Sequence, residues 1–235
     1  ALAAREKGLP LVNIAQPFKS SGMMLTCRKD MGVNTTADLK GKTLGVWFYG
    51  NEYPFLSWMS RLGLKTDGSA NGVTVLRQGW GVEPLTEGQA ACVSTMSYNE
   101  YWVVRDAGYS PEQLTVFKYQ SEGAATLEDG LYVHEKNLSD AAFKDKMVRF
   151  VRASMKGWKY AEANPKEAAM IILDNDDAGV QTEKHQVRMM GEIAKLTAGS
   201  NGSLDPADYE RTVKVLMSGD SDPVITKKPS GAWTN

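Results

Sequence analysis

Two short segments of this chain place aromatic rings beside acids and amides. The segments are GVWFYGNEYPF, residues 45–55, and TMSYNEYW, residues 95–102. Rings stack on flat heteroaromatic molecules, which contributes about 0.5–1.5 kcal/mol per pair beyond area burial. Carboxylates and amides give directional hydrogen bonds to amino groups and ring nitrogens. Both segments therefore indicate a site for a small heteroaromatic ligand. The candidate ligand-binding residues in them are Trp47, Gly50, Asn51, Glu52, Tyr53, Met96, Tyr98, Asn99 and Glu100.

A third segment, QPFKSSG, residues 16–22, also follows an apolar run and combines a ring with polar side chains. We expect these side chains to close the same site from another part of the protein. The candidates are Gln16, Phe18, Ser20 and Ser21. Every candidate also has a purely structural interpretation, because rings can pack on a sheet. Glu52 and Glu100 can likewise be first-turn acids that the helix dipole favours.

Catalytic and metal chemistry has little support in the sequence. The two histidines, His134 and His185, have no partner nearby in the chain, so neither a Ser–His–Asp triad nor a zinc site is predicted. Cys27 and Cys92 are too few for a disulfide scaffold, and we expect buried, unreactive thiols. The acidic stretch at 175–180 lacks the spacing of a calcium loop. The chain is therefore predicted to be a non-enzymatic protein without metal or cofactor.

The bulk properties exclude further classes. The chain has 235 residues and a formal net charge of −1, which gives no electrostatic footprint for nucleic acid. It holds no run of 18 apolar residues, so no membrane span is predicted. The first ten residues contain no signal peptide and resemble the end of a helix that Gly8 closes. We therefore expect a fragment or processed form of a longer protein, and a monomer.

Strands and helices alternate between residues 43 and 119, which is typical of βαβ units with a parallel sheet. Helices dominate after residue 139. Ligands of such sheets bind beyond the carboxyl ends of the strands, where the two aromatic segments begin. The expected strands are 9–18, 23–29, 43–48, 73–78, 90–96, 114–119 and 131–135. The expected helices are 49–64 (after an initial loop), 81–89, 98–108, 139–164 and 165–173, with two more before residue 218.

Several stretches carry a family resemblance. VNTTADLKGKTLGV, residues 33–46, resembles a stretch common to bacterial solute-binding proteins of ABC importers. The resemblance continues through LTEGQAACVST, residues 85–95, and LEDGLYVHEKNL, residues 127–138. The closing VITKKPSGAWTN, residues 224–235, is similar to the NMT1/THI5-like branch, which includes binding proteins for thiamine pyrimidine precursors and SsuA-type proteins.

The resemblance implies an α/β protein with the two-lobed periplasmic-binding-protein fold (type II), here without its N-terminal βαβα segment. Residues 1–31 plus 128–235 would form lobe 1 and residues 32–127 lobe 2. The ligand would lie in a cleft between the lobes. Strands at 24–27 and 131–134, if they lie side by side, would bridge the lobes.

The implied function is capture of a small heteroaromatic ligand, such as a thiamine pyrimidine precursor, for an ABC importer permease. The implied location is the periplasm or a lipid-anchored extracellular position. One alternative is a binder of nitrate, sulfonate or taurine, with its anion at the helix start after Gly50. A second is a cytoplasmic or membrane-tethered ligand sensor with the same fold. A third is a THI5-like pyrimidine synthase. That enzyme is disfavoured because Cys92 stands alone and neither aromatic segment contains a histidine.

Overall fold

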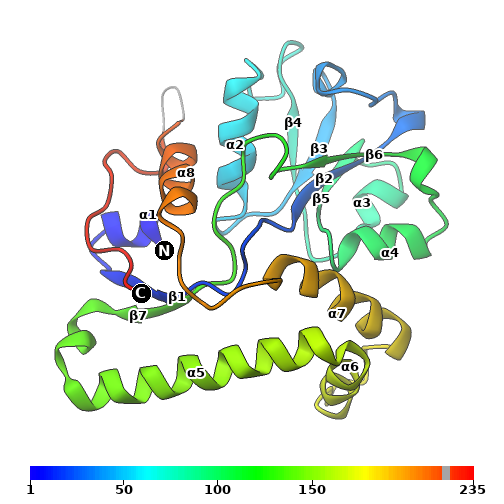
Figure 1. The fold of residues 1–235 in the computed structure, drawn as a ribbon. Coiled ribbons are helices and arrows are strands. Elements are labelled where there is room, and N and C mark those ends of the chain that lie inside the picture. Colours follow the sequence, from blue (N-terminus) through cyan, green and yellow to red (C-terminus); the bar gives the residue numbers. More distant parts are fainter. Residues whose placement is uncertain (219–222) are drawn as a thin grey trace. The chain divides into compact units, whose positions relative to one another are not determined.

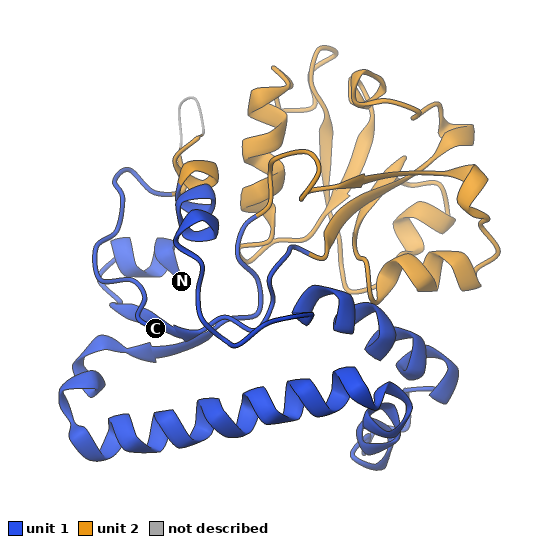
Figure 2. Cartoon of the chain, viewed as in Figure 1, with its two compact units in different colours: residues 1–21, 126–213, 225–235 blue, residues 22–125, 214–224 orange. Residues whose placement is uncertain are grey.

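The computed structural model describes residues 1–218 and 223–235. The chain divides into two compact units, shown in Figure 2. Unit 1 comprises residues 1–21, 126–213 and 225–235, and unit 2 comprises residues 22–125 and 214–224. The protein has a mixed α/β architecture, as the sequence predicts. None of the helices in the described ranges is long and apolar enough to cross a membrane.

Unit 2 is built on a five-stranded mixed sheet with the order β4-β3-β5-β2-β6 (Figure 1). Strand β3 runs parallel to β4 and β5, and β2 runs antiparallel to β5 and β6. The predicted parallel arrangement is thus found in β4-β3-β5, and β2 is the strand that runs the other way. The bounds are β2 Met23–Arg28, β3 Thr43–Val46, β4 Thr74–Arg77, β5 Cys92–Met96 and β6 Leu114–Lys118.

Three α-helices and three short 3₁₀ turns connect these strands. The core of unit 2 lies under α2, where the Trp58 ring is 5.6 Å from Phe117 and 5.5 Å from Tyr119, centroid to centroid. All three residues are nearly or fully buried. The helices are α2 Glu52–Arg61, α3 Glu83–Thr86 and α4 Glu100–Asp106, and the turns are η1 Lys29–Met31, η2 Thr36–Leu39 and η3 Pro111–Gln113.

Strand β2 occupies a different place from the one predicted. The strand expected beside it, β7 (Leu131–His134), pairs instead with β1 (Leu11–Ala15), antiparallel, with Leu11 opposite His134. Five of the six residues of β2 are buried, so the strand needs cover on both faces. Its place between β5 and β6 pairs both of its edges with other strands. The condition for a bridging pair, β2 and β7 side by side, is therefore not met. Unit 2 begins at residue 22, and the lobe boundary after residue 31 stays a prediction.

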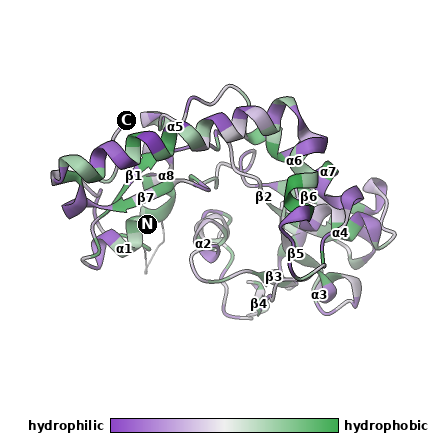
Figure 3. Ribbon diagram, turned by 90° about the horizontal axis from the view of Figure 1, so that it is seen from below, coloured by the Kyte–Doolittle hydropathy of each residue, from purple (hydrophilic) through white to green (hydrophobic). Residues whose placement is uncertain are grey.

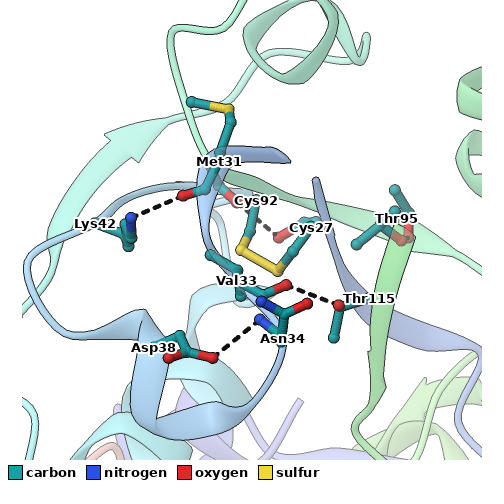
Figure 4. The surroundings of a disulfide bond; sticks show 12 residues. Cys27, Met31, Val33, Asn34, Asp38, Lys42, Cys92, Thr95 and Thr115 are labelled. Carbon is teal, nitrogen blue, oxygen red and sulfur yellow. Dashed lines mark hydrogen bonds between the residues drawn. A yellow bond between two sulfur atoms is a disulfide. The ribbon is translucent and has the colours of Figure 1, made fainter. Parts of the chain in front are cut away.

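The two cysteines form a disulfide, which corrects the expectation of unreactive thiols (Figure 4). Burial is as expected, since Cys27 and Cys92 are both fully buried. The bond forms because β2 lies antiparallel to β5 with Cys27 directly opposite Cys92, although 65 positions separate them. Nearby, the Thr115 hydroxyl donates to the Val33 carbonyl at 2.7 Å. The pairing of β2 with β5 determines this bond. The spacing of two cysteines in the sequence does not reveal that pairing.

Unit 1 combines the β1-β7 pair with most of the helices. Asp140 caps the 23-residue helix α5 by accepting a hydrogen bond from the Ala142 N–H at 2.9 Å. Figure 3 shows alternating apolar and polar colouring along α5. Of its residues only Met155 is buried, and Phe150 is 50% exposed. The helices are α1 Leu2–Glu6, α5 Ala141–Ala163, α6 Pro165–Asp174, α7 Glu183–Thr197 and α8 Pro206–Met217, with the 3₁₀ turn η4 Glu135–Ser139. Helix α8 continues past the unit boundary at 213/214.

Candidate ligand-binding site

The candidate site lies at one edge of the unit 2 sheet. Because β3, β4 and β5 run in the same direction, their carboxyl ends meet at this edge. The chain leaves the three strands through residues 47–51, 78–82 and 97–99. Neighbouring strands lie about 4.8 Å apart, so the outer two exits, of β4 and β5, are about 10 Å apart. A small ligand can therefore touch all three exits.

At the exit of β3, Trp47 is half-buried and its indole N–H donates to the Gly79 carbonyl at 2.9 Å. This bond ties the exit of β3 to the exit of β4. Tyr49 has a positive φ of 65°, which is uncommon for a residue with a side chain, and its ring is 94% exposed. Gly50 follows with φ 109°, where glycine carries no steric cost. The turn therefore directs a large ring into solvent at the sheet edge.

Helix α2 begins directly after this turn. The Gly50 N–H donates to the Glu52 carboxylate at 2.7 Å. Asn51 is exposed, and its amide donates to the Phe48 carbonyl at 3.4 Å. Tyr53 is half-buried and lines a groove of unit 2 beside Leu56. Glu52 thus stands where the structural interpretation places it, as a first-turn acid whose negative charge the helix dipole favours.

At the exit of β5, Glu100 organises the predicted segment. Its two carboxylate oxygens accept hydrogen bonds from the Met96 N–H at 2.9 Å and the Asn99 side-chain amide at 2.7 Å. Burial raises the pKa of Glu100, and these hydrogen bonds partly oppose that shift. Tyr98 is half-buried in the same turn. The Trp102 indole donates to the Ser97 carbonyl at 3.0 Å, which joins the turn to helix α4.

The exit of β4 was not recognised from the sequence. Gln78 is buried, and its amide donates to the Ser94 carbonyl at 3.0 Å and accepts from the Ser94 N–H at 2.8 Å. Its side chain lies over Gly45 of β3, where an added Cβ would come within 3.2 Å of the Gln78 oxygen. Gln78 therefore links the exit of β4 to strand β5. The Trp80 ring beyond it is 95% exposed. The sequence feature that could have revealed this exit is the run RQGWG, residues 77–81, at the end of a predicted strand.

The candidates in the third predicted segment belong to unit 1, where they stabilise their own loop. The Gln16 amide is buried, donates to the carbonyls of Phe18 and Glu128, and accepts from Asn13. Phe18 is buried with its ring edge-on to Trp158, 5.7 Å between centroids. Ser20 is half-buried, and Ser21 donates to the Glu128 carboxylate.

The structure therefore brings nine of the thirteen predicted residues together in unit 2 and places the other four in unit 1. It adds Arg77, Gln78 and Trp80 to the unit 2 group. A ligand-binding role for these residues, and the cleft predicted between the lobes, stay predictions.

Comparison with known proteins gives the family and the fold. The family model described as NMT1/THI5 like matches residues 1–168. A formylaminopyrimidine-binding protein of Halalkalibacterium halodurans is 23% identical over the whole of this chain and 72% of its own length.

Two solved structures share the fold. A ligand-binding component of an ABC-type import system from Staphylococcus aureus has a TM-score of 0.62 and 14% identity, over 92% of this chain and 70% of the other. A putative periplasmic sulfonate-binding protein from Methylobacillus flagellatus has a TM-score of 0.61 and 13% identity, over 91% of this chain and 62% of the other. The fold is thus the predicted periplasmic-binding-protein fold. Since the family match spans more than half of the 235 residues, this chain belongs to the NMT1/THI5-like family.

Proposed function

We propose that the chain is the substrate-binding component of an ABC import system and captures a small heteroaromatic ligand, such as a thiamine pyrimidine precursor. The observation that carries the proposal is the gathering of rings and hydrogen-bonding groups at the neighbouring exits of β3, β4 and β5. Exposed apolar groups that gather at one edge are typical of a ligand-binding site. Both the family and the pyrimidine-binding relative support this ligand class.

Glu100 offers the polar part of such a site. A carboxylate has about four lone-pair positions, and the Met96 and Asn99 donors occupy one on each oxygen. The remaining positions can accept hydrogen bonds from an exocyclic amino group. Tyr98, two residues before Glu100, supplies a ring in the same turn. A flat, amino-bearing ring therefore suits the exit of β5.

A binding role is favoured over catalysis. Cys92 is bonded to Cys27, so no free thiol is present near the edge. Both histidines belong to unit 1, where the His134 ring nitrogen accepts from the Lys136 N–H at 3.4 Å. The proposed partners are the small ligand and the importer permease, and the proposed location is outside the cytoplasmic membrane.

The alternative of a simple anion site at the start of α2 is less favoured. The Gly50 N–H, which would bind the anion, is already bonded to the Glu52 carboxylate. A second acidic group placed there would be repelled by Glu52. The sulfonate-binding neighbour, at 13% identity, supports the shared fold and does not select this ligand.

Isothermal titration calorimetry tests the proposal on the complete chain, freed of ligand by unfolding and refolding. The panel comprises 4-amino-5-hydroxymethyl-2-methylpyrimidine, its formylamino analogue, taurine, an alkanesulfonate and nitrate. We expect a pyrimidine to bind, and Tyr98→Ala to weaken that binding by about tenfold, the loss of one ring stack. Tyr160→Ala, an exposed tyrosine on α5, is the matched control and should bind normally. Binding of taurine, sulfonate or nitrate alone, unaffected by Tyr98→Ala, would refute the heteroaromatic ligand.

A further inference from the structure

Arg77 ends strand β4, and its guanidinium lies over two rings of the neighbouring exit. Its central carbon lies 4.8 Å from the Phe48 ring centroid and 5.0 Å from the Tyr49 ring centroid. Both distances are within the range of cation–π attraction. Arg77 is nevertheless exposed. The rings therefore hold the guanidinium in place without covering it.

The charge of Arg77 has no protein partner. Within residues 1–218 and 223–235, Arg77 forms no ion pair and donates no hydrogen bond. Two arginines of the same unit are instead used internally. Arg28 pairs with Asp30 at 2.7 Å, and Arg61 donates to the carbonyls of Gly123 and Glu122. A guanidinium presents five N–H donors in a planar fork that matches phosphate, sulfonate and carboxylate oxygens. At Arg77 the whole fork is available.

The surroundings of Arg77 match one kind of ligand. The bond between the Trp47 indole and the Gly79 carbonyl ties the loops on either side of Arg77 together. The exposed rings of Tyr49 and Trp80 belong to these two loops. The Gly50 N–H before α2 is not free for an anion, since it donates to the Glu52 carboxylate. A cation beside exposed rings, about 10 Å from the exit of β5, suits an aromatic ring that bears an acidic substituent.

We propose that Arg77 is a specificity-determining residue that binds an anionic oxygen group on the aromatic ligand. The ligand class is then a heteroaromatic anion, either a phosphate ester or a sulfonate, with its ring toward the exits of β3 and β5 and its acidic group at the exit of β4. This inference rests on the proposed heteroaromatic ligand. A single ligand of this class would contact both the Arg77 guanidinium and the exposed rings.

Calorimetry with three probes tests the inference on the complete chain. The probes are the neutral hydroxymethyl aminopyrimidine, its monophosphate ester and pyridine-3-sulfonate. We expect the ester or the sulfonate to bind more tightly than the neutral alcohol. Arg77→Gln should raise the dissociation constant of that anion by about tenfold or more and change that of the alcohol by less than about twofold. Arg77→Lys, which keeps the charge and loses the fork, should give an intermediate value.

Arg149→Gln is the matched control, because it also removes one positive charge from an exposed site, where Arg149 pairs with Asp145. It should leave all three affinities unchanged. One outcome is that the alcohol binds while Arg77→Gln leaves the ratio between the dissociation constants of the alcohol and of the anions unchanged. In that case the role of Arg77 is refuted and the proposed function stands. If only the aryl sulfonate binds, and through Arg77, the inference stands and the pyrimidine assignment fails. Binding of none of the three probes refutes both.

Discussion

The disulfide of unit 2 allows a quantitative prediction about folding. Cys27 and Cys92 are 65 positions apart, so the bond closes a long loop in the unfolded chain. In the chain-entropy description, a loop of this length lowers the entropy of the unfolded state enough to stabilise the folded unit by about 4 kcal/mol. Both cysteines are fully buried, so reduction leaves two unpaired thiols inside an apolar core that tolerates them. The free energy of unfolding lost on reduction should therefore be close to the contribution of loop closure in the unfolded chain.

The assay is urea unfolding followed by tryptophan fluorescence, to which Trp58 in the core of unit 2 contributes along with the five other tryptophans of the chain. One sample is refolded with reductant and the other without. We expect the free energy of unfolding of unit 2 to fall by about 2–4 kcal/mol under reductant. Cys27→Ala/Cys92→Ala should show no response to reductant. Two titratable thiols in the unfolded, unreduced protein, or coincident unfolding curves, would refute the pairing.

Three further predictions concern single residues. Gly130→Ala should destabilise unit 1 by about 1–3 kcal/mol, because the new Cβ would lie 2.4 Å from the buried Asn13 amide. Gly157→Ala, in open space within α5, should instead stabilise the protein by about 0.5–1 kcal/mol, and thermal unfolding compares the two variants. Glu100 has a raised pKa in the folded state, so its contribution to stability is largest below the ordinary pKa of a glutamate and falls as pH rises through the raised value. The difference in unfolding free energy between the wild type and Glu100→Gln should therefore decline over that pH range, and a constant difference would contradict the burial argument.

The sequence by itself determined the secondary structure closely. Every predicted strand appears within a few residues of its expected limits, because runs of apolar residues and their glycine and proline boundaries are local signals. The helices expected over 139–164 and 165–173 likewise appear as α5 and α6, with Asp140 as the cap of α5 and Pro165 in the first turn of α6. The two aromatic segments after β3 and β5 were recognised by the same local reasoning, as was the family.

Tertiary structure alone decided which strands are neighbours. A buried strand such as β2 has the same apolar pattern whichever strands pair with it. Its pairing with β5 and β6 therefore could not be predicted. The bond between Cys27 and Cys92 and the bridge from Gln78 to Ser94 depend on that order. The same holds for Arg77, which reads as one more charged residue in the sequence. It becomes a candidate ligand contact only because the parallel pairing of β3 with β4 places it against Phe48 and Tyr49, residues almost thirty positions earlier in the chain.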